Sequence, residues 1–287
     1  MKLIPLLTAA AVLSPMASSA VLIYGLTTSN SLISFDSATP AITSLPVAIT
    51  QPGIVDIDFY PANGLLYGMT NNGDLYRINT TNGTTVSAPV ASGIVGATDM
   101  DFNPSADRAR IFANGAIGAD NNFRLVPDVV TAPNIGIAGT TTNDGSFGYP
   151  SGGGSPFTLV GSAYSNNFDS GGGATTLFSI DFEGDRLFSH STSGTDPLGS
   201  FNTLTLVGSL GFNLGTAAGF DIDQSGNAWV SNGNAFYSLA LGTGAATFVN
   251  NVNTPGLLSI AAVAVPEAST TAALVLAGLC VLRRRRS

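Results

Sequence analysis

Residues 54–86 read IVDIDFYPANGLLYGMTNNGDLYRINTTNGTTV, and this stretch holds four short apolar segments separated by three Asn-Gly pairs. The pairs begin at Asn63, Asn72 and Asn82. Asn-Gly supplies the two positive φ angles that a tight antiparallel hairpin requires. The apolar segments are rich in β-branched and aromatic residues, which favour strands. The stretch therefore predicts four antiparallel strands in succession.

This unit recurs along the chain. Asp58-Phe59-Tyr60-Pro61 returns 43 residues later as Asp101-Phe102-Asn103-Pro104, and Tyr24-Gly25 returns at the same offset as Tyr67-Gly68. A later copy begins at Gly219-Phe220-Asp221-Ile222. Four strands in roughly 40 to 50 residues are typical of a propeller blade. A two-sheet sandwich would contain the same strands, but the regular period favours the propeller.

The first and last segments of the central region together complete one further blade. Residues 22–48 contain three predicted strands, and residues 257–265 contain one more. Pairing these segments would close the ring and leave no exposed sheet edge. We therefore predict an all-β fold, a β-propeller of five blades with four antiparallel strands each. The predicted blades are residues 22–48 with 257–265, 54–91, 97–145, 156–210 and 217–252.

Residues 1–20 predict a signal peptide. Lys2 precedes an apolar stretch, and small residues lead up to a predicted signal-peptidase cleavage between Ala20 and Val21. The alternative, an uncleaved anchor helix, is disfavoured because the apolar stretch is shorter than the roughly 20 residues that a membrane span needs. The central domain is then predicted to comprise residues 21–264.

Residues 265–287 predict a sorting tail. Val265-Pro266-Glu267 precedes an apolar segment, residues 268–282, which is expected to form a helix. The segment is short for a permanent anchor, so we expect transient membrane insertion followed by removal of the tail. The basic residues that would hold its end on the cytoplasmic side are Arg283, Arg284, Arg285 and Arg286.

The central region is acidic and contains no cysteine. Residues 21–264 include five arginines, no lysine and seventeen acidic residues, a formal charge of −12. Such a surface repels nucleic acid and anionic lipid, which excludes both as expected partners. It could attract divalent cations, since hard cations prefer oxygen ligands. Because the one cysteine, Cys280, lies in the tail, the exported domain must be held by its core alone.

The central region resembles the domain-of-unknown-function family numbered 4394. The resemblance rests on the run from Ile54 to Tyr67 and covers nearly all of residues 22–264. It implies a propeller-like fold, and the family has no established activity. The further matching motifs, in order, are Asp101-Phe102-Asn103-Pro104, Asn122-Phe123-Arg124-Leu125, residues 159–167 and residues 217–222.

The tail resembles the PEP-CTERM sorting signal, with Ala268 in place of the usual proline. The resemblance implies recognition by an exosortase-type membrane enzyme and removal of the tail. It also implies delivery to the cell surface, the outer membrane or the exopolysaccharide matrix of a Gram-negative bacterium.

Asp58, Asp101 and Asp221 fall at matching points on the first strand of three predicted blades. That strand lines the channel of a propeller, so these residues are the candidate metal ligands, and Ca²⁺ is the one cofactor they suggest. Further aspartates lie two residues away, on the same side of each strand. Such pairs could instead catalyse glycoside hydrolysis, or cap turns and accept backbone N–H bonds in every blade. Repetition favours the structural role, because catalysis needs a single site; the neighbouring residues are Asp56, Asp99 and Asp223.

Other motifs offer less chemistry. His190 is the only histidine, which excludes a transition-metal site built on His and Cys, and it is predicted to be solvated. Gly242-Thr243-Gly244 is predicted to be a hairpin turn rather than a phosphate loop. Six aromatic residues of the second and last blades could stack on sugars, but at strand spacing they are predicted to be core: Tyr60, Tyr67, Tyr76, Trp229, Phe236 and Tyr237. Arg108, Arg110 and Arg124 are predicted to pair locally with Asp99, Asp107 or Asp120.

The sequence therefore predicts an exported, surface- or matrix-sorted protein with no catalytic residue, a non-enzymatic binding or structural module. One alternative is a secreted carbohydrate-active enzyme that uses carboxylates at the channel mouth, which requires them to stand in an open cleft. The other alternative is a calcium-stabilised extracellular scaffold. Exopolysaccharide is the candidate extracellular partner.

Overall fold

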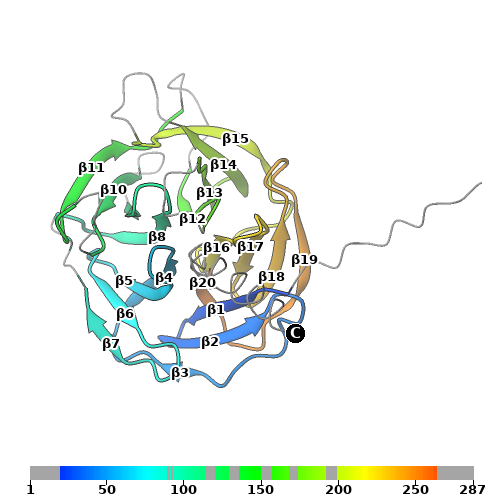
Figure 1. Cartoon of the computed structure of the whole chain (residues 1–287). Coiled ribbons are helices and arrows are strands. Elements are labelled where there is room, and N and C mark those ends of the chain that lie inside the picture. The colour runs from blue at the N-terminus through cyan, green and yellow to red at the C-terminus, as the bar shows by residue number, and fades with distance from the viewer. Residues whose placement is uncertain are drawn as a thin grey trace, which may run out of the picture.

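The computed structural model describes residues 20–88, 91, 93–113, 120–128, 136–149, 157–167, 174–191 and 199–263. Within these ranges, twenty strands form five four-stranded antiparallel sheets, and no helix occurs. The sheets stand around a central axis as the blades of a propeller (Figure 1). The predicted fold class, blade number and strand number are confirmed.

Four blades are built from consecutive strands, with the first strand of each innermost. Blade 2 contains β4 (Ile54–Tyr60), β5 (Leu65–Thr70), β6 (Leu75–Ile78) and β7 (Thr85–Ser87). Blade 3 contains β8 (Ala97–Asn103), β9 (Arg108–Ala113), β10 (Asn121–Leu125) and β11 (Thr141–Ser146). Blade 4 contains β12 (Leu159–Tyr164), β13 (Leu177–Asp181), β14 (Arg186–Ser191) and β15 (Thr203–Ser209). Blade 5 contains β16 (Ala218–Ile222), β17 (Ala228–Asn232), β18 (Ala235–Leu239) and β19 (Ala246–Asn251).

Blade 1 joins the two ends of the domain. Its inner strand is β20 (Leu257–Ala262), followed outward by β1 (Leu22–Thr27), β2 (Ser31–Asp36) and β3 (Val47–Ala48). β20 pairs antiparallel with β1, and Ile23 lies opposite Ala262. The pairing joins the last strand of the domain to the first in one sheet, so the predicted closure is confirmed.

The repeated Tyr-Gly pair has a packing reason. A Cβ atom on Gly68 would lie 2.7 Å from Cδ1 of Ile78, and one on Gly25 would lie 2.7 Å from Cδ2 of Leu257. Both distances are too short for carbon atoms in contact. Glycine therefore lets a side chain of the same blade fill the space above the second strand, which explains why the pair recurs at the blade period.

The five inner strands run in the same direction along the axis, which gives the ring two distinct faces. We call the face at which the inner strands begin the mouth face, and the face at which they end the exit face. Val263 directly follows β20, and its N–H donates to the carbonyl of Leu22 at the start of β1 (3.0 Å). Both ends of the described domain therefore leave the ring side by side at the exit face.

Candidate functional site

Five aspartates link the inner strands to one another around the axis. We call them the axial carboxylates: Asp56, Asp58, Asp99, Asp101 and Asp221. In each case a carboxylate oxygen accepts a hydrogen bond from a backbone N–H of the next inner strand around the ring. The donors, in the same order, are Met100, Phe102, Ser162, Tyr164 and Ala262.

The side chains are also held from their own strands. In Asp56, Asp58 and Asp221 the second carboxylate oxygen accepts the N–H of the following residue, at 2.9, 2.6 and 2.6 Å respectively. A carboxylate with both oxygens bonded to backbone has one orientation open to it. These side chains are therefore fixed parts of the blade contacts.

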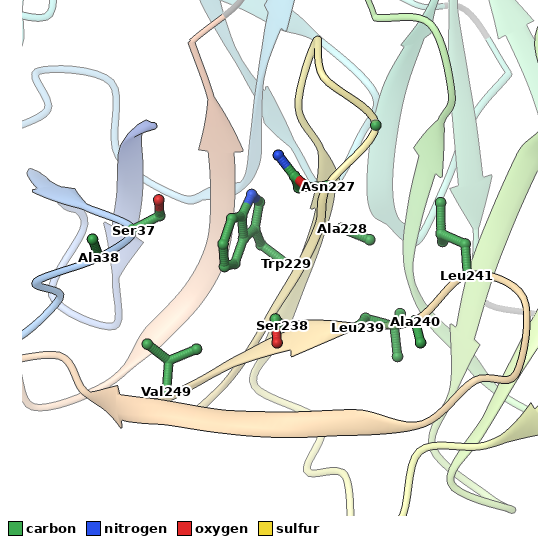
Figure 2. A pocket seen from close by; sticks show the side chains of 11 residues that line it. Ser37, Ala38, Asn227, Ala228, Trp229, Ser238, Leu239, Ala240, Leu241 and Val249 are labelled. Atoms are coloured by element: carbon green, nitrogen blue, oxygen red, sulfur yellow. The ribbon is translucent and has the colours of Figure 1, made fainter. Parts of the chain in front are cut away.

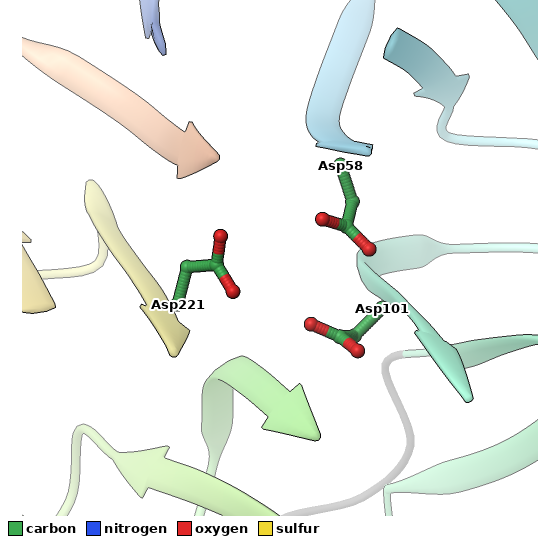
Figure 3. A group of neighbouring side chains, drawn as sticks. All are labelled: Asp58, Asp101 and Asp221. Carbon is green, nitrogen blue, oxygen red and sulfur yellow. The ribbon is translucent and has the colours of Figure 1, made fainter. Parts of the chain in front are cut away.

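Asp58, Asp101 and Asp221 form a cluster on the axis, which we call the axial trio. Each offers a carboxylate oxygen that lies within 4.8 Å of those of the other two. The three side chains point toward one another from β4, β8 and β16 (Figure 3). All three residues are at most 2% exposed. The trio confirms that the aspartates predicted at matching blade positions meet at the axis.

The electrostatics of the trio favour partial protonation or a bound cation. Burial and the neighbouring Asp221 carboxylate raise the pKa of Asp58 well above its usual value. Burial, Asp58 and Asp221 do the same to the pKa of Asp101, and burial raises the pKa of Asp221 to about 7. None of the three takes part in an ion pair among the described residues. Three buried like charges without a counter-charge are costly, so a proton or a divalent cation would stabilise them.

A cavity of about 300 Å³ opens onto the axis at the mouth face. Asp56 and Asp99 lie in its wall, one level nearer the mouth than the trio. Burial raises the pKa of Asp99 to about 7, although the Ser162 side chain and backbone both donate to its carboxylate. All five inner strands contribute to the lining, through Val55, Thr98, Val160, Ala218 and Leu258 among others.

Asp223 does not belong to this arrangement. Its carboxylate accepts hydrogen bonds from the Ser225 backbone (2.8 Å), from Asn227 and from the indole Nε1 of Trp229 (3.1 Å). It therefore organises the turn between β16 and β17. The predicted pairing of Asp221 with Asp223 as two presented carboxylates is not what the structure contains.

His190 is buried, which overturns the prediction of a solvated side chain. It is 5% exposed, because the rings of Phe112 and Phe147 pack against it. Its Nε2 lies 2.7 Å from Oγ of Ser179, and its Nδ1 lies 3.0 Å from the carbonyl of Phe201. Burial lowers the pKa of His190 to about 3. Ser179 is fully buried as well, so this Ser-His contact has no route to a substrate.

The arginine cluster pairs with an acid that sequence reasoning did not select. Arg110 and Arg124 both bind Asp144 in β11, at 2.7 and 2.6 Å. Arg110 is 1% exposed and also donates to the hydroxyl of Tyr164 and to the carbonyls of Gly199 and Ser200. The cluster therefore ties blade 3 to blade 4 and offers no free anion site.

A second cavity, of about 570 Å³, lies beside Trp229 between blade 5 and the end of β2 (Figure 2). The indole ring stacks on Phe236 at 5.4 Å, and both residues belong to the core. Tyr60 and Tyr67 are buried too, so the predicted core role is confirmed for these four residues, whereas Tyr76 and Tyr237 are half-buried. Residues 242–244 form the turn between β18 and β19, as predicted.

The geometry at the axis suits binding better than hydrolysis. Glycoside hydrolysis needs two carboxyl groups about 5 to 10 Å apart that face a substrate in an open cleft. The axial carboxylates are buried, and each accepts a hydrogen bond from a backbone N–H of the next blade. The criterion set above for a channel-mouth glycosidase is not met at these residues.

The predicted sorting motif, Val265, Pro266 and Glu267, and the arginines at 283–286 lie outside the described residues, as does the predicted apolar segment 268–282. No helix able to span a membrane occurs in the part of the chain that the structure describes. Of the predicted cleavage pair, Ala20 is exposed, and the backbone N–H of Val21 donates to Oγ of Ser37 at 3.0 Å.

Several solved propellers are similar to this chain. Regucalcin from Agrobacterium tumefaciens, described as a calcium-binding protein, shares 15% identity, with a TM-score of 0.44 over 84% of this chain and 73% of its own. A gluconolactonase from Xanthomonas campestris shares 13%, with a TM-score of 0.45 over 83% and 78%. A luciferin-regenerating enzyme shares 10%, with a TM-score of 0.43 over 84% and 83%. These likenesses are too distant for a function to pass from one protein to another.

The search of curated proteins finds no match to this chain. The model of one protein family, "Domain of unknown function (DUF4394)", matches residues 23–264. The match covers all the described strands and leaves out only Leu22, the first residue of β1. It agrees with the resemblance found in the sequence motifs. The chain therefore belongs to the DUF4394 family.

Proposed function

We propose that this protein is an exported, surface- or matrix-sorted scaffold without a catalytic site, whose five-bladed ring presents a rigid face for binding. The observation that carries the proposal is the bonding of the axial carboxylates to the backbone of the next blade. Groups used in this way stabilise the ring, and their burial leaves little carboxylate surface for a substrate. The acidic side chains that a carbohydrate-active enzyme would use at the channel mouth are therefore already hydrogen-bonded within the protein.

The export and sorting part of the proposal rests on the two ends of the sequence. Signal peptidase would cleave between Ala20 and Val21, and an exosortase-type enzyme would remove the tail after recognising Val265-Pro266-Glu267. Exopolysaccharide is the proposed extracellular partner. The intact mass of the protein released from the cell surface tests both cleavages at once. A mass that retains residues 1–20 or residues 268–287 would contradict the proposal.

We also propose that the axial trio binds a calcium ion. Three ligand atoms that all lie within 4.8 Å of one another leave room for an ion about 2.8 Å or less from each, close to the 2.3–2.6 Å of Ca²⁺–oxygen contacts. None of the described ion pairs involves these three carboxylates. The bound ion would therefore supply their counter-charge. Backbone donors already hold the side chains in place, so binding requires little reorganisation.

The enzyme alternative has a direct test. Purified protein is incubated with a panel of polysaccharides, in the presence of Ca²⁺, and reducing ends are measured. The non-enzymatic scaffold predicts no release above a blank. Release that disappears in Asp101→Asn, while circular dichroism shows that the variant is folded at the assay temperature, would establish the carbohydrate-active enzyme instead.

A further inference from the structure

We propose that the exit face lies against the lipid surface while the tail is attached, so that the mouth face and its axial cavity point away from the membrane. The inference rests on the proposed function, because it requires the tail to insert into the membrane. The partner of this face is a zwitterionic headgroup layer. The domain's formal charge of −12 excludes attraction to anionic lipid, so the contact has to be apolar.

The tether is too short for the domain to turn over. Val263 is bonded to Leu22 at the exit face, and the predicted apolar segment begins only five residues later, at Ala268. Five residues span at most about 17 Å when fully extended. A compact chain of this length has a radius of gyration of about 18 Å, which makes the body roughly 45 Å across. The mouth face therefore cannot reach a membrane that holds the tail.

Apolar side chains lie beside the base of the tether. Leu22, Leu65 and Val263 line a cavity of about 420 Å³ between blades 1 and 2, whose polar lining residues are Asn79, Thr80 and Thr81. Leu22 and Leu65 are nearly half exposed, although each stands at the start of a strand that is otherwise mostly buried. Because Val263 is the base of the tether, this cavity is held next to the lipid surface whenever the tail is inserted.

The apolar surface continues outward from Leu22. Leu22 lies opposite Asp36 at the end of β2, and the segment after β2 folds back along that strand through a bridge between Phe35 and Thr43. Ile42, which directly precedes this bridge, is 73% exposed and extends the patch beyond the cavity. Leu45 lies farther along the outer edge of blade 1, beside the middle of β2, and is not part of the patch.

The mouth face is different. Strand direction places four of the exposed large apolar side chains of the described residues at the exit face, because each lies at the start of a second strand or in the turn that follows a third strand. On the same argument the mouth face has one among the described residues, Val95, between β7 and β8. The exit-face residues are Leu22, Ile42, Leu65 and Ile137.

Fluorescence quenching on vesicles tests the orientation. The full chain, with Cys280→Ser, carries a single introduced cysteine at Ile42 or Ile137 on the exit face, or at Val95 on the mouth face as the matched control. Each variant is labelled with a fluorophore and reconstituted into phosphatidylcholine vesicles with and without a headgroup-spin-labelled lipid. We expect labels at positions 42 and 137 to lose most of their fluorescence to the spin label, and the label at position 95 to keep it.

The possible results distinguish a failure of the proposed orientation from a failure of the proposed function on which it rests. Equal quenching at positions 42 and 95, or stronger quenching at 95, in protein that floats with the vesicles would overturn the orientation and leave tail insertion intact. Protein that does not float with the vesicles would overturn the membrane role of the tail and the orientation together. The second exit-face position, Ile137, keeps the test valid if Ile42→Cys does not fold.

Discussion

The carboxylate of Asp221 in β16 accepts a hydrogen bond from the backbone N–H of Ala262 in β20, so the last blade is joined at the axis to the strand that closes the first. Ala262 in turn pairs with Ile23. The closing contact is thus of the same kind as those that Asp58 and Asp101 make between consecutive blades. The same type of hydrogen bond therefore closes the ring and joins consecutive blades.

Removing this carboxylate is expected to destabilise the domain strongly. Asp221→Ala leaves the buried N–H groups of Ile222 and Ala262 without acceptors, at about 1–3 kcal/mol each. Relief of repulsion within the axial trio offsets part of this, so we expect a net loss of about 2 kcal/mol in urea unfolding. Glu183→Ala is the control, because its contact with Thr158 is exposed, and it should stay within about 0.5 kcal/mol of wild type. A loss equal to that of the control would mean that closure does not need this bond.

Calcium is expected to raise the melting temperature, and Asp101→Asn to reduce that effect. Asparagine keeps an oxygen for the Tyr164 N–H but removes one of three buried negative charges. In EDTA at pH 8 the variant should therefore melt higher than wild type, by about 2–4 °C for each kcal/mol of repulsion relieved. In millimolar Ca²⁺ it should gain less than wild type.

Differential scanning fluorimetry with EDTA, Ca²⁺ and Mg²⁺ measures both effects. Asp36→Asn is the control, since Asp36 lies away from the axis and accepts a bond from Ala38 in an exposed turn. An unchanged melt of wild type after chelation would rule out an ion at the trio. The same Ca²⁺ gain in Asp101→Asn and wild type would place the ion elsewhere.

The metal-free domain is expected to lose stability as the pH rises from about 4 to about 7. The pKa of Asp99 and that of Asp221 are each raised to about 7 in the folded state, mainly by burial, against about 3.9 for an unfolded aspartate. Between these two values the folded state binds more protons than the unfolded state, so its stability falls as the pH rises and levels off above about 7. His190, with its pKa lowered to about 3, acts in the opposite direction but only below its unfolded pKa of about 6.5.

Urea midpoints in EDTA between pH 5 and 8.5 measure this trend. We expect a decrease up to about pH 7 and little further change above it, with a smaller decrease once Ca²⁺ is added. A midpoint that stays level or rises between pH 5 and 7 would show that the axial carboxylates are already ionised at pH 5.

Replacing Arg110 is expected to be among the most damaging changes outside the axis. Arg110→Met removes a cation that is 1% exposed and leaves two backbone carbonyls and the Asp144 carboxylate short of donors. Breaking a buried ion pair in this way lowers the free energy of unfolding by about 3–5 kcal/mol. Arg124 still pairs with Asp144 in the variant, which reduces the loss. Arg77→Met is the control, because Arg77 is half-buried and forms none of the described ion pairs. Circular dichroism melts of the two variants should differ clearly, and equal melts would contradict the role assigned to Arg110.

Blade number, strand boundaries and closure could be predicted because they follow from local patterns. An Asn-Gly turn, a Tyr-Gly pair or an apolar segment acts within its own blade, and the 43-residue offset repeats the pattern for the next one. The matching positions of Asp58, Asp101 and Asp221 are visible for the same reason, because equivalent residues on the inner strands of a ring must converge on its axis.

The partners of buried polar groups could not be predicted in this way. Arg110 meets Asp144 and the carbonyl of Ser200, which lie 34 and 90 residues away in the chain, and His190 is buried by phenylalanines of two other segments. What the sequence determined alone is the repeating unit, since hairpin turns and strand patterns depend on neighbouring residues. Only the tertiary structure decided which polar groups meet, because that depends on how long connections fold across adjacent blades and exclude water.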